Sequence, residues 1–478
     1  MTVRISIRGN PFFHDFSFPS FRFILLSLKG MNEMTQEVRG LMSEGNIWKQ
    51  LILFSVPLVL GNIFQQLYNA VDSMIVGNFV GKEALAAVTS SSPIINLLIS
   101  FFMGLSVGAG VVIARYFGAR DETGLSDSIH TSMCMIVIAG IVMTFAGVLL
   151  TPFILRWIGV PDDVMTDSVL YLRIYFYGIL GVMVYNMGSG VLRALGDSRT
   201  PLLFLILSSL INVVLDYGFV VWFHMGIAGV AWATLISQCI SAALIWALMM
   251  KQNGLRFSRL KLHAHILGEV VRVGLPSGIQ NAIVSFSNLI VQSNINAFGS
   301  AAMAGCGAYT KIDGFAILPA MSYSMAITTF TGQNIGAGKH ERVRQGLKAC
   351  LVLTLITSFL ISGLLFLFGD SALRIFSNDP QVIAYGHTML MLLAPGYFLL
   401  AISHAISGVL RGANRAASAM VIIIACWCGM RMAWIMVTVP LFHRIETVLL
   451  GWPLSWLVST IIFILYYRKS SWLPEAGR

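Results

Sequence analysis

Twelve long apolar runs constrain this 478-residue chain more than any other feature of its sequence. A membrane-spanning helix needs about 20 predominantly apolar residues. The runs reach that length without the apolar–polar alternation of a transmembrane β-barrel. Charged residues make up only 11% of the chain, whereas a soluble domain has about 25%. We therefore predict an all-α polytopic membrane protein with twelve transmembrane helices, at about 50–75, 90–115, 130–151, 168–192, 200–222, 227–250, 268–296, 304–330, 348–368, 383–409, 417–440 and 447–467.

The composition and motifs argue against several other classes of protein. The net charge is +10, but no compact basic patch and no zinc-ligand spacing accompany it, so we expect no nucleic-acid partner. The six cysteines lie inside apolar runs without a CxxC pair, which favours packing over disulfides or a metal site. The sequence has no HExxH or Walker-A motif, so we predict that the protein is not an enzyme.

Lysines and arginines between the runs predict the orientation in the membrane. If both termini are cytoplasmic, twenty of these residues fall in inner segments, against four in outer loops: Lys82, Arg156, Arg374 and Arg444. Lys and Arg are enriched in cytoplasmic loops. We therefore expect a multi-pass protein of the cell (inner) membrane with both termini in the cytoplasm.

Segment boundaries follow from the same runs. Residues 1–45 form an N-terminal extension, which we expect to be disordered or to precede the native start at Met31 or Met34, with an interfacial anchor as the alternative. Two six-helix lobes then cover residues 46–250 and 268–470. A cytoplasmic linker at 251–267, in which His263 and His265 are expected to be solvated, joins them, and a cytoplasmic tail covers 471–478.

The two lobes repeat each other at a shift of about 218 residues. Repeats of this parallel kind occur in transporters, whose substrate sites lie between the repeats. The matched pieces are 56–57 with 275–276, 116–120 with 334–338, and 190–193 with 408–411.

The first helix of each lobe carries a stripe of polar residues on one face, spaced by four, three and four positions. In hydrocarbon such a face must meet protein or water. Hydrogen bonding between helices is one explanation, and a water-filled substrate cavity between the lobes, which we favour, is the other. The stripes are Asn62, Gln66, Asn69 and Ser73, and Asn281, Ser285, Asn288 and Gln292; the predicted cavity residues are Gln65, Gln66, Asn69, Asn281, Ser285, Asn288 and Gln292.

Two carboxylates inside the spans, Asp72 and Asp216, are the most informative residues. Each costs at least about 2.5–3.5 kcal/mol at mid-membrane, so an unused one is improbable. Thr234 lies at the same depth of the first lobe, and Asn212 is four residues from Asp216 on one helix face. Their oxygen ligands suit H⁺ or Na⁺ and no transition metal. The alternative is a hydrogen-bonded cluster that only packs the lobe. The second lobe has no acids at the corresponding positions.

Other charges inside the spans are Arg173, Lys311, Asp313 and Arg431. Lys311 and Asp313 are two positions apart and do not face each other on a helix. For these four charges, structural pairing across helices is one interpretation, and cavity lining or coupling is the other.

The chain resembles the multidrug and toxic compound extrusion (MATE) family in residues 65–77, 190–201 and 212–216. The resemblance implies two six-helix bundles that export amphipathic, often cationic, compounds in exchange for H⁺ or Na⁺. Within the family, the chain is similar to the DinF-type branch. The resemblance implies that the ion site of that branch maps onto Asp72, Asn212, Asp216 and Thr234, and that its first-helix hinge proline corresponds to Pro57. The NorM-type branch instead uses a Glu on helix seven for coupling, whereas the polar stripe of that helix consists here of amides and Ser, so the resemblance does not extend to NorM-type coupling.

The function that we predict is a cation-coupled multidrug antiporter that works by alternating access as a monomer, with the coupling ion in place of a cofactor. A lipid-linked oligosaccharide flippase of the same superfamily is the alternative, but it should have a strongly cationic cavity. A non-transporting receptor or channel would not need two repeated lobes.

Overall fold

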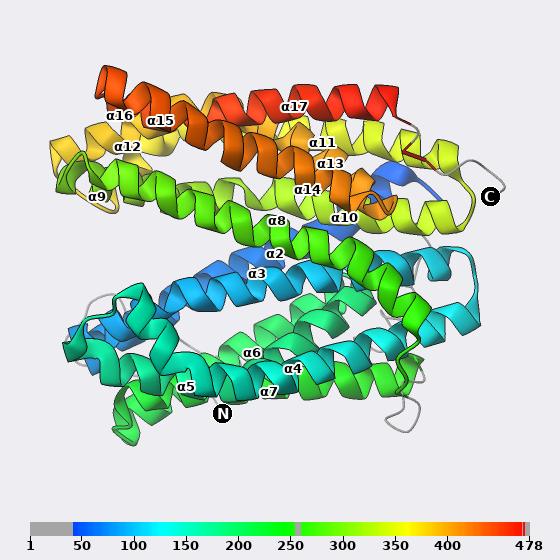
Figure 1. The fold of residues 1–478 in the computed structure, drawn as a ribbon, viewed down its shortest axis with the longest axis horizontal. Coiled ribbons are helices and arrows are strands. Elements are labelled where there is room, and N and C mark those ends of the chain that lie inside the picture. The colour runs from blue at the N-terminus through cyan, green and yellow to red at the C-terminus, as the bar shows by residue number, and fades with distance from the viewer. Residues whose placement is uncertain (1–41, 254–259, 471, 474–478) are drawn as a thin grey trace. The chain divides into compact units, whose positions relative to one another are not determined.

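The computed structural model describes residues 42–253, 260–470 and 472–473, and within these residues the chain is helical throughout its regular structure (Figure 1). This confirms the predicted all-α membrane fold with two lobes. The first lobe contains α2 (Ile47–Ile75), η2 (Val76–Val80), α3 (Lys82–Gly118), α4 (Glu122–Ile158), α5 (Asp162–Ala194), α6 (Arg199–Tyr217), η3 (Gly218–Trp222) and α7 (Gly226–Asn253). The second contains α8 (Ala264–Asn296), α9 (Ser300–Ala316), α10 (Leu318–Gly336), α11 (His340–Arg374), α12 (Pro380–Leu393), η5 (Ala394–Gly396), α13 (Tyr397–Gly412), α14 (Ala416–Ile423), η6 (Ile424–Met430), α15 (Arg431–Phe442), α16 (Ile445–Leu449) and α17 (Gly451–Lys469).

Each of the twelve predicted runs corresponds to a helix or to consecutive helical segments. Ten helices in the described residues are long and apolar enough to cross a membrane. The other two runs correspond to α8, which carries Glu269, Arg272 and the amide stripe, and to α9 with α10, which are separated at Ile317. The run predicted at 304–330 is therefore helical on both sides of a break at Ile317.

The first helix of each lobe begins against the other lobe. Leu51 and Phe54 of α2 are buried in the hydrophobic core of the second lobe. Ile266 and Val270 of α8 are buried in the core of the first. The hydrophobic core of each lobe therefore includes residues from the start of the other lobe's first helix, so the cores do not follow the lobe boundaries that the sequence predicts at residues 46 and 268.

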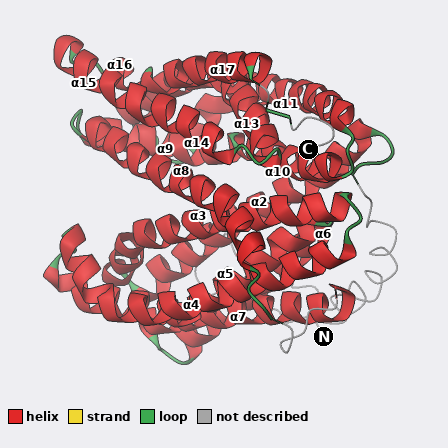
Figure 2. Ribbon diagram, turned by 45° about the vertical axis from the view of Figure 1, so that its right-hand side comes forward, coloured by secondary structure: helices red, strands yellow, loops and turns green. Residues whose placement is uncertain are grey.

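The lobes meet most closely where α3 crosses α8 (Figures 1 and 2). Two glycines on each helix, spaced by four, face one another: Gly104 opposes Gly278, and Gly108 opposes Gly274. A Cβ atom on Gly104 or Gly108 would overlap the backbone of the opposing helix. Glycines at this spacing let membrane helices approach to backbone contact, and α4–α7 lie on one side of this crossing and α11–α17 on the other.

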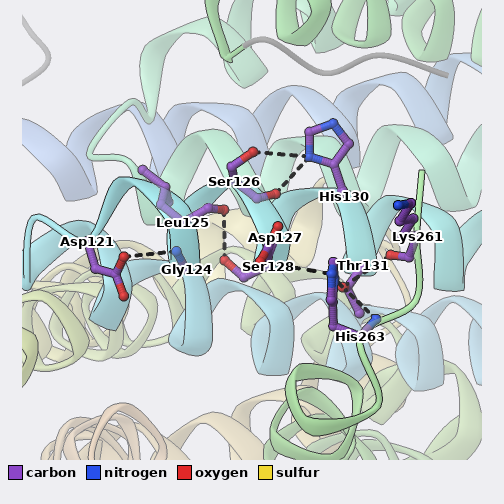
Figure 3. Close-up of polar contacts among 10 residues, drawn as sticks. All are labelled: Asp121, Gly124, Leu125, Ser126, Asp127, Ser128, His130, Thr131, Lys261 and His263. Carbon is purple, nitrogen blue, oxygen red and sulfur yellow. Dashed lines mark hydrogen bonds and ion pairs between the residues drawn. The ribbon is translucent and has the colours of Figure 1, made fainter. Parts of the chain in front are cut away.

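The connection between the lobes is anchored on α4 (Figure 3). The backbone N–H of His263 donates to Oγ1 of Thr131 at 3.2 Å, and its Nε2 lies 3.9 Å from Oδ2 of Asp127. His263 is thus half-buried rather than solvated as predicted, because it precedes the first turn of α8 and packs on α4. His265 remains exposed.

Residues 42–45, the last of the predicted extension, pack against the second lobe. Met42 is 3% exposed; its N–H donates to Oε1 of Gln333 at 2.7 Å, and Arg342 donates to the carbonyl oxygens of Met42, Glu44 and Gly45. The rest of the predicted extension, with Met31 and Met34, lies outside the described residues, as do residues 254–259 of the linker and all but 472 and 473 of the predicted tail.

Candidate functional site

The two predicted carboxylates meet inside the first lobe. Asp72 lies in the last turn of α2 and Asp216 in the last turn of α6, and the helices pack against each other. Asp216 is fully buried, Asp72 is half-buried, and the two side chains are close enough to interact. Two ionised carboxylates repel each other in a low-dielectric setting, so a proton or a cation bound here would stabilise the pair.

Asn212 and Thr234 complete the group. Asn212 is 1% exposed and lies one turn before Asp216 on α6. The neighbouring donor and acceptor groups fix the amide of Asn212 with Nδ2 toward Asp216 and the oxygen toward Thr234. In this orientation Nδ2 donates to Oδ2 of Asp216 at 2.8 Å, and the amide oxygen accepts from the backbone N–H of Thr234 on α7 at 3.2 Å. All four predicted ion-site residues are therefore brought together by three helices, α2, α6 and α7.

Tyrosines surround this cluster, and the sequence reasoning did not include them. Tyr68 lies one turn before Asp72 on α2 and contacts the side chain of Thr234. Tyr171 and Tyr175 on α5 are buried beside the group. The available signal was the spacing of Tyr171 and Tyr175, which places two hydroxyls on one face of a helix inside the membrane.

The cluster has oxygen atoms to offer a cation. Oδ1 of Asp72 and Oδ1 of Asp216 are both buried, and neither has a hydrogen-bond partner in the described part of the chain. Buried polar atoms are normally satisfied. A proton or Na⁺ would satisfy both atoms, since Na⁺ takes carboxylate, amide and hydroxyl oxygens, and these residues therefore fit such an ion.

The amide stripes bridge the lobes at their first residues. Nδ2 of Asn62 on α2 donates to Oγ of Ser322 on α10 at 3.2 Å. In the second lobe, Nδ2 of Asn281 on α8 donates to the carbonyl oxygen of Ser100 on α3 at 3.3 Å. Each bridge joins the first helix of one lobe to the second helix of the other, so the first residue of each stripe faces the opposite lobe.

The remaining predicted cavity residues continue along these two faces. Gln65 donates to Asn69 at 3.5 Å, Gln292 donates to Asn296 at 2.9 Å, and Gln66 lies beside Gly314 of α9. Ser285 donates to the carbonyl oxygen of Asn281, and Asn288 accepts from Arg431. The structure thus uses several of these side chains in local hydrogen bonds and leaves Gln66, Asn69 and Asn288 exposed.

The predicted hinge and coupling residues have different surroundings. Pro57 is buried within α2, which continues through it. Asp313 accepts a hydrogen bond from the hydroxyl of Tyr397, which in turn is 2.7 Å from the hydroxyl of Tyr309. Lys311 is exposed on the same helix, α9, so Lys311 and Asp313 do not pair with each other.

A family model described as MatE matches residues 57–218 and 276–435, once in each lobe. The chain belongs to the MatE family. It is similar to two proteins of Bacillus subtilis (strain 168): the probable multidrug resistance protein YpnP, at 30% identity over 90% of this chain and 97% of YpnP, and the probable multidrug resistance protein YoeA, at 31% identity over 89% and 94%. MatE proteins are transporters, so this chain is a multi-pass membrane transporter and not an enzyme.

Solved structures share the fold. One is described as the outward-facing conformation of a multidrug resistance MATE family transporter of the MOP superfamily; it matches with a TM-score of 0.83 at 24% identity, over 90% of this chain and 96% of that one. At this identity the match supports the two-lobe architecture alone.

Proposed function

We propose that this MatE transporter exports amphipathic organic compounds, many of them cationic, in exchange for H⁺ or Na⁺ bound at Asp72 and Asp216. The observation that carries the proposal is the buried carboxyl pair with two unpartnered oxygens. The printed names of YpnP and YoeA support the substrate class. One charge moving through 100 mV supplies about 2.3 kcal/mol, enough for roughly fifty-fold accumulation.

The site performs the exchange through its own residues. The carboxyl pair holds the ion, while Asn212 keeps Asp216 oriented and Thr234 closes the group from α7. Charge on the pair without an ion is costly in a low-dielectric setting. Ion binding at the outer side therefore favours one arrangement of α2 and α6. Pro57 cannot donate a backbone hydrogen bond, so bending α2 at this residue costs little free energy.

Contacts between the lobes support alternating access. At the predicted cytoplasmic end, a Cβ on Gly118 or Gly336 would overlap the backbone of the opposing helix, and Arg115 of α3 forms a 2.5 Å ion pair with Glu269 of α8. We infer that this conformation is closed toward the cytoplasm and that export requires these contacts to break. The neutral and acidic stripes disfavour the flippase alternative, which needs a cationic cavity for phosphate head groups.

The test of the proposed function is transport in sealed vesicles that contain the purified protein. A pH gradient and a Na⁺ gradient are imposed separately against a panel of fluorescent cationic dyes. We expect dye accumulation with at least one gradient and none after its collapse by an ionophore. Accumulation that persists without either gradient would contradict ion coupling.

The Arg115–Glu269 ion pair yields a prediction about closure. Replacing Glu269 by Gln removes one side of a half-buried pair whose side chains are 31% and 21% exposed. Such pairs contribute up to about 1 kcal/mol, so we expect the cytoplasmic end to open about fivefold more often. Labelling of a cysteine introduced at Ala413, which lines a cavity with Arg115, by a membrane-impermeant maleimide measures the opening.

The matched control is Glu341→Gln. Its ion pair with Arg344 lies within α11 and joins no lobes. We expect the labelling rate of this control to equal that of the parent. Equal rates in Glu269→Gln and Glu341→Gln would show that the ion pair does not hold the lobes together.

A further inference from the structure

Arg431 is a buried cation without a buried anion beside it. The side chain is 1% exposed in the second lobe, at the start of α15. Nη1 donates to Oδ1 of Asn288 at 3.1 Å, Nη2 donates to Oγ of Ser455 at 3.0 Å, and the guanidinium lies 5.4 Å from the ring centroid of Trp452. Its Nε has no partner, and no carboxylate of the described residues forms an ion pair with it.

A purely structural role explains these contacts only in part. Hydrogen bonds to Asn288 and Ser455 tie α15 to α8 and α17, and a neutral side chain could do the same. Burying a charge without an opposite charge is costly. Gly451 also leaves the space that the stem of Arg431 occupies, since a Cβ there would lie 3.2 Å from its Cγ. The lobe is thus built around a positive charge whose partner is not among the described residues.

Arg431 fixes the orientation of Asn288. An arginine only donates, so the atom of Asn288 that faces it must be the amide oxygen. The NH₂ group is therefore directed away from Arg431. Asn288 is exposed, and it lies seven residues, almost two turns, after Asn281 on the face of α8 that meets α3. The second lobe therefore presents the NH₂ group of Asn288 toward the first lobe, and the guanidinium of Arg431 lies behind this amide.

The repeat shows that the two lobes carry side chains of opposite charge near the depth of Asn288 and Arg431. Asn288 corresponds to Asn69 of α2 at the shift of about 218 residues, and Arg431 corresponds to Val213, the neighbour of Asn212. Where the first lobe buries Asp72 and Asp216, the second buries a cation. A compound between the lobes therefore meets the neutral amides of α2 on one side and a positively backed donor on the other.

We propose that Asn288, positioned by Arg431, is a subsite for an oxyanion, such as a carboxylate, on the transported compound. This rests on the proposed function, because the compound must lie between the lobes. Asn288 touches the oxyanion through its NH₂ group. Arg431 is a positioning residue that holds the amide and supplies the charge behind it. The preferred cargo is then an amphipathic compound that carries both a cationic and an anionic group.

The test compares two dyes that differ by one group: rhodamine 110, which has a free carboxylate, and its methyl ester, rhodamine 123. Fluorescence polarisation with the purified, detergent-solubilised protein gives a Kd for each. Asn288→Asp places a carboxylate against Arg431 and presents oxygen instead of NH₂. A hydrogen bond to a charged group is strong, so we expect the preference for rhodamine 110 over the ester to fall at least about tenfold.

Controls separate this proposal from the proposed function and from misfolding. Asn294→Ala, whose amide donates only to the carbonyl oxygen of Ile290 within α8, should leave the ratio of the two Kd values unchanged. Arg431→Lys keeps the positive charge but loses the planar guanidinium that contacts Asn288 and Ser455 together. We expect its ratio of the two Kd values to lie between those of the parent and Asn288→Asp, with normal binding of the ester. Gradient-driven efflux of rhodamine 123 by the parent protein is measured separately and tests the proposed function alone. An unchanged Kd ratio in Asn288→Asp would overturn the subsite, whatever the outcome of the efflux measurement.

Discussion

Asp72→Asn is expected to abolish gradient-driven efflux while the protein still folds. Asn has nearly the shape of Asp, but it cannot exchange a proton and it offers no charge to Na⁺. Asp216 would then lose the neighbouring carboxylate with which we propose that it shares the coupling ion. Dye efflux from sealed vesicles under the coupling gradient measures the effect, and we expect a rate equal to that of empty vesicles.

A matched control shows that the effect belongs to the site. Asp162→Asn makes the same chemical change at an exposed carboxylate in the first turn of α5, and we expect full efflux. Size-exclusion profiles should show that both variants remain folded. If Asp72→Asn retains efflux close to the parent rate, Asp72 does not bind the coupling ion.

Gly104→Leu is expected to have the largest effect on stability. A side chain at this position would enter the backbone of α8 at Gly278, where no flexible atom can move aside. Overpacking costs about 1–3 kcal/mol where neighbours can adjust, so we expect a loss of at least about 3 kcal/mol here. The measurement is the fraction of detergent-solubilised protein that remains monodisperse after heating.

The control for this prediction is another glycine within a helix. Gly363 of α11 has nothing within 4 Å of the position that a Cβ would take. Gly363→Ala should therefore be as stable as the parent, or slightly more so because alanine favours helices. A Gly104→Leu protein that melts together with the parent would show that the lobes are not held by the α3–α8 crossing.

Much of the fold and part of the candidate site could be predicted from the sequence. Helix positions followed from apolar length, and the break at Ile317 was missed because apolar residues continue across it. Asp72 and Asp216 stood out because acids inside spans are rare. The glycines of the α3–α8 crossing were also visible as two GxxxG pairs, Gly104 with Gly108 and Gly274 with Gly278, but their partners were not.

The sequence by itself determined the class of protein, the number and order of the helices, the repeat and the acids, because the thickness of a bilayer and the cost of burying charge act on each segment alone. Only the tertiary structure decided that Tyr68, Tyr171 and Tyr175 surround the acids and that Arg431 faces Asn288. These contacts depend on the rotation of each helix about its axis. A helix that is apolar on nearly all sides carries little periodic signal to specify that rotation, so packing against the other helices must set it.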